Sequence, residues 1–392
     1  MMTLDSSSSF LNTSTPPEKP SIIIQPHASS ALQGVLLGQL VTQGPIPLWE
    51  KRVLPCMQQA ILNIITPDVS KLADSLTHAL QVRGKLLRPS MTILFTLLLL
   101  RENPAYQALS DEALVDKLEA RHWDTAAISE LIHIATLLHD DVLDQSDLRR
   151  HQVTVRAKWG NHQAILSGDY LLAQASIKLA QVGSIPLVER YSHVLAALCQ
   201  GEVLQWDTQY STAWDWDTYV KKTHYKTSSL FEAACEAAAI LEAPEQRMAL
   251  ANLGRQFGWL FQLRDDVLDL TASEAEAGKP VLDDLRNGLV GIPVWMVLRS
   301  DDIPEYTKAS LKQHIAHVFH YAQGSHETFP LLEESLQHVT ELLEVHGAVD
   351  RTHTWMKEEV ASLSANIHTL FPRSSLWREF LLQWVGLLLP LG

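Results

Sequence analysis

The sequence is short of cysteine and of positive charge, and each shortage excludes a class of protein. Its 392 residues include three cysteines, Cys56, Cys199 and Cys235, which lie far apart. An odd number with no metal-ligand spacing predicts neither a disulfide framework nor a zinc site, so we expect a reducing compartment, the cytoplasm. Lysine and arginine number 31 against 45 aspartates and glutamates. Nucleic-acid binding is therefore not expected, because that function needs an excess of cations to neutralise phosphates.

The sequence also lacks the apolar patterns of a membrane protein or a signal peptide. Crossing a bilayer takes roughly 20 apolar residues, and the run ILFTLLLL (93–100) lies between Arg88 and Arg101. It predicts a buried helix and no membrane span. The first thirty residues are rich in Ser, Thr and Pro and lack the basic start and apolar stretch of a signal peptide. We expect residues 1–45 to form a flexible N-terminal extension.

Strand signals are scarce as well, whereas helical periodicity is widespread. Apolar and polar residues do not alternate over any sustained stretch, but apolar residues recur every three to four positions in several long segments. Those segments are 128–144, 162–182, 230–243 and 250–270. No linker-like segment divides the chain after residue 45. The sequence therefore predicts a single all-α domain over residues 46–392, folded as one large helical bundle.

Two copies of the sequence DDVLD are the most informative feature that is present. The first copy contributes Asp140, Asp141 and Asp144, and the second contributes Asp265, Asp266 and Asp269. Carboxylates this close repel one another and need a nearby cation. A single acidic cluster is usually a solvated helix face, but both copies are embedded in apolar helical sequence. We therefore interpret them as functional sites.

Helix geometry places these carboxylates at one end of an apolar stripe. In each copy the first and third aspartates are four residues apart and share a helix face, which His133 extends in the first copy. Oxygen ligands without a zinc or calcium pattern favour Mg²⁺, which binds a few carboxylates together with substrate phosphates. Two such helices facing one another would line the mouth of an apolar cavity and hold a diphosphate through Mg²⁺.

Basic residues suited to phosphate binding occur in three places. Arg contacts phosphate oxygens through two donors, and Lys acts as a point charge. The candidates are Lys85 and Arg88, then Arg149 and Arg150 directly after the first acidic copy, and Lys226. Any one of them alone would usually be a surface cation. Together with the acids they indicate two diphosphate sites, one reached through Mg²⁺ and one through Lys and Arg directly.

Several longer motifs occur in order between about residues 75 and 295. They are GKLLRP (84–89), ELIHIATLLHDDVLDQSDLRR (130–150), WGNHQAILSGDYLLAQA (159–175), QGEVLQ (200–205), YKTSSLFEAAC (225–235) and FQLRDDVLD (261–269). This combination resembles the all-trans isoprenyl (polyprenyl) diphosphate synthases. The likeness is greatest to medium- and long-chain members such as octaprenyl and solanesyl diphosphate synthases.

The resemblance implies a fold and a set of roles. The fold would be a helical bundle around a deep central cavity, usually in a homodimer, with a different partner subunit as the alternative. All six aspartates would bind Mg²⁺, or alternatively Mn²⁺, bridging an allylic diphosphate. The direct metal ligands, which form the catalytic set with Lys226, would be Asp140, Asp144 and Asp265. The residues expected to hold isopentenyl diphosphate are Lys85, Arg88, His133 and Arg150. Those expected to contact the allylic diphosphate are Arg149, Lys226, Thr227 and Gln262.

The implied activity is prenyl transfer. The allylic diphosphate ionises, the double bond of isopentenyl diphosphate attacks the carbocation, and repeated head-to-tail steps lengthen an all-trans chain in a cavity that excludes water. In the family, the positions four and five before the first aspartate form the cavity floor. Here they are Thr136 and Ala135, both small. We therefore expect a medium- or long-chain product, with a geranylgeranyl-length product as the alternative.

The chain also departs from the family pattern after the second acidic copy. Leu289 stands where the family usually has a lysine, which would remove one cation facing a diphosphate. Two rival interpretations fit the sequence less well. A class I terpene cyclase would need a glutamate where Ala277 stands, and it has no use for the Lys85 and Arg88 pair. A non-catalytic synthase subunit, which Leu289 would favour, tends to lose aspartates, and all six are present.

Overall fold

The described part of the chain is almost entirely helical, as the sequence predicts. The computed structural model describes residues 46–81, 86–149, 152–271, 281–324 and 329–389. In the first half the helices are α2 (Ile46–Leu48), the π-helix η1 (Trp49–Val53), α3 (Leu54–Ile64), α4 (Ser70–Gln81), α5 (Leu87–Glu102), α6 (Asp111–Val115), α7 (Ala120–Leu143), α8 (Val155–Trp159), α9 (Asn161–Val182) and α10 (Ile185–Thr208). They are followed by α11 (Trp216–Thr223), the π-helix η2 (His224–Ser228), α12 (Ser229–Glu242), the 3-10 helix η3 (Pro244–Gln246), α13 (Arg247–Thr271), α15 (Asp283–Arg286), α16 (Ile292–Leu298), α17 (Glu305–Ala322), α18 (Phe329–Val345), α19 (Ala348–Leu370) and α20 (Leu376–Gly386).

Three of the sequence predictions lie outside the described residues. They are the extension at 1–45 and the candidate phosphate ligands Lys85 and Arg150. The four helical segments predicted from periodicity do fall within the described part, and they are confirmed as α7, α9, α12 and α13. The apolar run at 93–100 lies in α5, where residues 89–100 are all buried.

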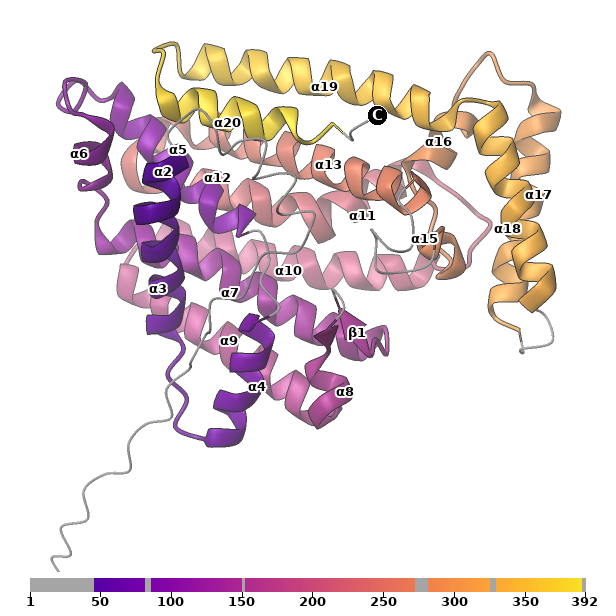
Figure 1. Cartoon of the computed structure of the whole chain (residues 1–392), viewed down its shortest axis with the longest axis horizontal. Coiled ribbons are helices and arrows are strands. Elements are labelled where there is room, and N and C mark those ends of the chain that lie inside the picture. The colour runs from indigo at the N-terminus through magenta and orange to yellow at the C-terminus, as the bar shows by residue number, and fades with distance from the viewer. Residues whose placement is uncertain (1–45, 82–85, 150–151, 272–280, 325–328, 390–392) are drawn as a thin grey trace, which may run out of the picture.

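Helix α12 is the centre around which the helices of the candidate site are arranged. Its residues Ser229 to Ala239 are all buried, and the helix packs against α5, α7, α10 and α13 (Figure 1). Five alanines in this helix leave short side chains, so neighbouring helices approach it closely. The two helices that carry the acidic copies, α7 and α13, are thereby held against one common helix.

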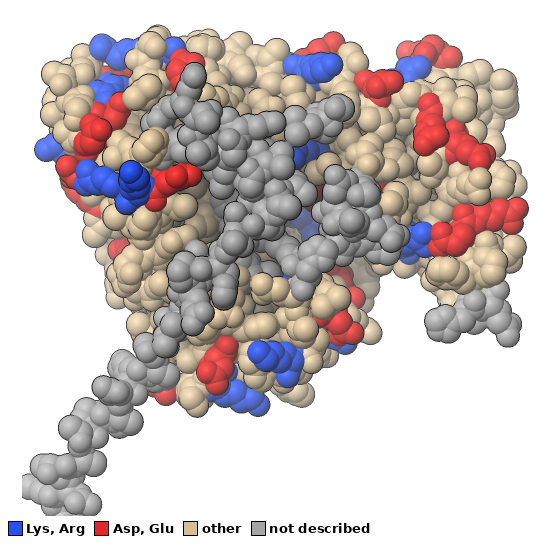
Figure 2. All heavy atoms as spheres, viewed as in Figure 1, with Lys and Arg blue, Asp and Glu red and all other residues tan. Residues whose placement is uncertain are grey.

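The C-terminal helices form the outer part of the molecule. Helix α19 lies along α13 and α16, and the α17–α18 pair stands at one end of the bundle with its own apolar cluster (Figure 1). Figure 2 shows several acidic side chains over this end, in keeping with the net charge of −14. Within the described residues, no helix is both long enough and apolar enough to span a bilayer.

A short hairpin directly after α7 is not predicted by the sequence. Strands β1 (Leu148–Arg149) and β2 (Gln152–Val153) pair antiparallel, with Leu148 opposite Val153 and Arg149 opposite Gln152. Two residues are too few to show an alternating pattern, which is why periodicity does not detect them. Arg149 of β1 reaches back to Asp141 in the last turn of α7.

Candidate active site

The first acidic copy lies at the C-terminal end of α7, where its aspartates point in two directions. Asp144 ends the helix, and its backbone N–H donates to the carbonyl oxygen of Asp140 at 2.8 Å. Asp141 is buried, with 4% of its surface exposed, and its Oδ1 accepts a hydrogen bond from Arg149 Nε at 2.8 Å. One of the two arginines after the motif is therefore the protein's own counterion for the second aspartate.

Asp140 and Asp144 meet residues from two other helices. Burial raises the pKa of Asp140 to about 7, nearby Lys226 and Arg149 lower it, and the charges of Glu202 and Asp144 raise it further. Lys226 Nζ lies 2.5 Å from Glu202 Oε2. Helices α7 and α10 and the π-helix η2 thus bring three carboxylates and a lysine together.

Glu202 is a site residue that the sequence did not single out. It lies in the motif QGEVLQ, which contributed to the family resemblance without a role for its glutamate. The one sequence signal that could have pointed to Glu202 is its acidic side chain in a helical segment, at a position outside the periodic apolar pattern.

Lys226 is carried by a π-helix that is packed tightly on both sides. A β-carbon on Gly201 of α10 would lie 2.8 Å from Lys226 Cγ, and one on Gly258 of α13 would lie 2.6 Å from Ser228 Cα. Only glycine fits at these two contacts, so η2 is fixed between α10 and α13. A single π-helical turn within an α-helix is frequently found at a functional site.

The second acidic copy is connected to the same π-helix by hydrogen bonds. Thr227 Oγ1 donates to Gln262 Oε1 at 2.7 Å, and Gln262 Nε2 donates to Asp266 Oδ1 at 2.9 Å. Asp266 Oδ2 accepts from the hydroxyl of Tyr219 at 2.7 Å and from the backbone N–H of Ile292 at 2.8 Å. Burial raises the pKa of Asp266 to about 7, although these hydrogen bonds lower it. Thr227 and Gln262, both predicted to contact the allylic diphosphate, therefore lie together beside Asp266, whose carboxylate is hydrogen-bonded by other groups of the protein.

Asp265 and Asp269, which share a helix face, differ in exposure. Asp265 is exposed, whereas Asp269 is buried and in contact with Leu282 and with Asp284 of α15. The backbone N–H of Asp284 donates to Asp269 Oδ2 at 3.2 Å, and that of Leu282 donates to the carbonyl oxygen of Asp269 at 2.9 Å. Asp265 is accordingly the member of the second copy that is most accessible to a ligand.

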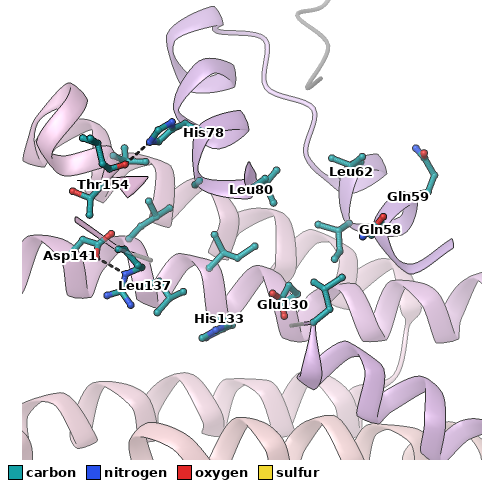
Figure 3. A pocket seen from close by; sticks show the side chains of 18 of the residues that line it. Gln58, Gln59, Leu62, His78, Leu80, Glu130, His133, Leu137, Asp141 and Thr154 are labelled. Carbon is teal, nitrogen blue, oxygen red and sulfur yellow. Dashed lines mark hydrogen bonds and ion pairs between the residues drawn. The ribbon is translucent and has the colours of Figure 1, made fainter. Parts of the chain in front are cut away.

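A pocket of about 420 Å³ lies on the adjoining face of α7. Figure 3 shows His133, Leu137 and Asp141 along α7, with Leu80 of α4 and Leu62 of α3 among the apolar side chains that complete the wall. His133 and Arg149, both predicted to bind substrate, line this pocket. Its walls are mainly apolar, with Asp141 and Arg149 at one end and Glu130 toward the other.

Three further predicted residues lie close to these elements. The guanidinium carbon of Arg88, at the start of α5, lies 4.5 Å from the centre of the Phe231 ring of α12. Thr136 is partly exposed one turn before Asp140, and its hydroxyl donates to the carbonyl oxygen of His133 at 2.8 Å. Ala135 is completely buried, in an apolar cluster that includes residues of α9.

The carboxylates of the first copy fit a bound divalent cation. The described residues contain no group of three His, Cys, Asp or Glu side chains already arranged as a metal site. Asp140 nevertheless lies among Asp144 and Glu202 in a partly buried position where its negative charge is strongly disfavoured. An oxygen-coordinated cation such as Mg²⁺ would relieve this cost while substrate phosphates completed its coordination.

Comparison with known proteins decides the family. A sequence profile described as polyprenyl synthetase matches residues 69–323. The chain belongs to the polyprenyl synthetase family. This confirms the assignment made from the motifs.

Curated relatives and a solved structure agree with the assignment. Solanesyl-diphosphate synthase 1, mitochondrial, of Oryza sativa subsp. japonica is 35% identical over 263 residues, which cover 64% of this chain and 59% of that protein. A prenyl transferase of Cyanophora paradoxa is 36% identical over 249 residues, 62% of this chain and 77% of that one. The crystal structure of a decaprenyl diphosphate synthase from Rhodobacter capsulatus is 26% identical, with a TM-score of 0.71 over 88% of this chain and 97% of that chain. The chain thus spans less than two thirds of the rice protein's length.

The raised pKa of Asp140 leads to a prediction about the metal-free protein. Because the folded-state pKa of about 7 exceeds the ordinary value of 3.8, ionising this carboxyl costs stability as the pH rises from about 4 to above 7. Asp140→Asn should therefore raise the melting temperature of metal-free protein at pH 8 by about 2–4 °C, or about 1 kcal/mol. Near pH 4 the two proteins should have the same melting temperature.

Differential scanning calorimetry with and without Mg²⁺ measures this effect. Added Mg²⁺ should stabilise the original protein and leave Asp140→Asn unchanged. Asp217→Asn, at an exposed aspartate of α11, serves as the matched control and should show neither effect. A lower melting temperature for Asp140→Asn at pH 8 would contradict the prediction.

Proposed function

We propose that this protein condenses isopentenyl diphosphate with an allylic diphosphate in repeated head-to-tail steps, giving a medium- or long-chain all-trans polyprenyl diphosphate. The observation that carries the proposal is the junction at η2. Lys226 lies with Asp140, Asp144 and Glu202 on one side of this π-helix, and Thr227 is hydrogen-bonded through Gln262 to the second acidic copy on the other. The π-helix η2 thereby brings acidic and basic groups that suit the binding of one diphosphate close to one another.

In this proposal the residues of the first site hold the leaving group. Asp140, Asp144 and Asp265 would hold Mg²⁺ or Mn²⁺, and the ion would supply positive charge to stabilise the departing diphosphate. Lys226 and Arg149 add cations beside the same group, where a partly buried setting strengthens each charge interaction. Apolar walls keep water from the allylic carbocation once the C–O bond has broken.

The second substrate is assigned to the side of α7 that carries His133. Arg88 lies at the start of α5, and by resemblance Lys85 and Arg150, both outside the described residues, would join it around the diphosphate of isopentenyl diphosphate. Its double bond forms the new C–C bond at the allylic carbon, and the proton that is then lost goes to the departed diphosphate. The pocket of about 420 Å³ beside His133 supports a partly apolar substrate at this position.

The product length is proposed from residues and from relatives. Thr136 lies on the same face of α7 as Asp140, one turn earlier, and its small side chain leaves room for a growing chain. The rice relative is named a solanesyl-diphosphate synthase and the Rhodobacter relative a decaprenyl diphosphate synthase. Both names favour a long-chain product over one of geranylgeranyl length.

We further propose that the protein acts as a homodimer in the cytoplasm. Helices α9 and α10 expose a set of large apolar side chains, and those on α10 recur at the helical period. The set consists of Ile165, Leu166, Ile177, Ile185, Val188, Val203 and Trp206. An exposed apolar face of this kind is typical of a protein–protein interface. The three free cysteines support a reducing compartment.

A product assay tests the proposed activity. Purified protein with Mg²⁺, labelled isopentenyl diphosphate and farnesyl diphosphate should yield chains longer than geranylgeranyl, sized by chromatography after dephosphorylation. Asp140→Ala should reduce turnover by about 10² or more, because it removes charge stabilisation of the leaving group, while Asp217→Ala should not. Failure of the original protein to condense the substrates, alone or as the isolated dimer, would refute the proposal.

A bulky residue at the proposed cavity floor should shorten the product. Thr136→Phe places a phenyl ring one turn from Asp140, so elongation should stop several units earlier than in the original protein. Thr136→Ser, which keeps the size of the side chain, should preserve the product length. Chromatography of the products gives the answer, and an unchanged distribution in Thr136→Phe would show that the chain grows elsewhere.

Charge introduced on the α9–α10 face should separate the proposed dimer. The double variant Leu166→Asp/Trp206→Asp should elute as a monomer in size-exclusion chromatography with light scattering, because buried like charges would face each other across the interface. Met248→Asp alters an equally exposed apolar residue on α13 and should remain a dimer. A monomeric original protein would exclude the homodimer.

A further inference from the structure

Leu289 lies in the turn between α15 and α16, at the position where the family resemblance leads us to expect a lysine. Its backbone N–H donates to the carbonyl oxygen of Asp284 at 2.8 Å, and the backbone N–H of Asp284 donates to Asp269 at 3.2 Å. These bonds connect the backbone of the turn before α16 to Asp269 of α13, and Leu289 supplies no positive charge there. If this site binds a diphosphate, positive charge must reach it from another element.

Lys222 of α11 lies near the same acidic region. It is one helical turn before Lys226, and its Nζ lies 5.6 Å from the centre of the Tyr219 ring. The hydroxyl of that tyrosine donates to Asp266 at 2.7 Å. Lys222 thus contacts the ring of Tyr219, whose hydroxyl is hydrogen-bonded to Asp266 of the second acidic copy.

The charges around Lys222 come from both halves of the candidate site. Burial lowers the pKa of its ammonium, Asp266 and Asp284 raise it, Lys226 lowers it and Glu202 raises it. Asp266 and Asp284 belong to the second acidic region, whereas Glu202 and Lys226 belong to the first. The ammonium therefore lies where the two halves of the site meet.

We propose that Lys222 binds the allylic diphosphate and supplies the positive charge that Leu289 does not provide. This inference rests on the proposed function, because it assigns a further ligand to the same substrate. No carboxylate among the described residues forms an ion pair with Lys222, and Asp266 is already bound by Tyr219, Gln262 and Ile292. Its three ammonium donors can thus serve a ligand with several phosphate oxygens.

The neighbouring lysine provides a matched control. Lys221 is exposed, and its Nζ lies 5.6 Å from the ring centre of Tyr225, not Tyr219. It has the same charge and nearly the same position in the chain but lies on a different face of α11. Any effect due only to the net charge of this helix would appear equally in Lys221→Met and Lys222→Met.

Steady-state kinetics and a direct binding assay test the proposal. Lys222→Met should raise the KM for farnesyl diphosphate by about 10-fold to 100-fold, since a hydrogen bond to a charged group is lost, and leave the KM for isopentenyl diphosphate within about 3-fold. Isothermal titration of inorganic pyrophosphate with Mg²⁺ should show a similar loss of affinity. Lys222→Arg and Lys221→Met should behave like the original protein.

A double variant that moves the lysine from position 222 to position 289, where the family usually has it, gives the decisive comparison. Lys222→Met/Leu289→Lys should recover most of the lost pyrophosphate affinity, because the new lysine approaches the same aspartates from the α15–α16 turn. A Lys222→Met protein with a lower melting temperature and lower kcat, but unchanged KM and pyrophosphate affinity, would assign Lys222 a purely structural role and overturn the proposal. If instead the original protein condenses no substrate while binding pyrophosphate through Lys222, the proposed function fails and this site stands.

Discussion

The structure depends above all on how carboxylates are kept ionised in partly buried positions. Six aspartates in two copies of one motif approach an interior where burial disfavours their charge. The protein stabilises some of them itself: Arg149 binds Asp141, and three donors bind Asp266. Burial nevertheless raises the pKa of Asp266 to about 7, and it raises the pKa of the more accessible Asp140 to about the same value. In the proposed function, the cost of the charge on Asp140 would make a cation and its diphosphate favourable ligands at this point.

The scaffold that holds these groups is itself built on buried charge. Glu232 and Glu236 of α12 are both buried, and Arg190 of α10 contacts them at 3.1 Å and 2.8 Å. Arg255 and Arg247 of α13 contact the same two glutamates at 3.0 Å and 2.9 Å. Ion pairs of this kind fix the relative positions of helices more than they add stability. They hold α10 and α13 on α12, and with them the π-helix that carries Lys226.

The sequence predicted the helices and acidic copies well, because both depend on local patterns. Helical periodicity located α7 and α13, and the four-residue spacing placed Asp140 and Asp144 together. Residues that act through tertiary contacts were not predicted. Glu202 and Lys222 lie on helices whose mutual positions no periodicity specifies, and the π-helix depends on Gly201 and Gly258 of two other helices. Their roles required knowledge of which helices pack together.

In both acidic copies the first and second aspartates differ in burial in the same way, and the common sequence alone does not explain this difference. In each copy the second aspartate is buried and bound by the protein: Asp141 is 4% exposed and Asp266 6%. The first aspartate is more accessible, since Asp140 is partly exposed and Asp265 exposed. Successive residues on a helix are rotated by about 100° about its axis, so the second carboxylate points away from the first. The two adjacent carboxylates therefore differ in what they can do: one is bound by protein donors, while its neighbour stays accessible for the ligand that the proposed function requires.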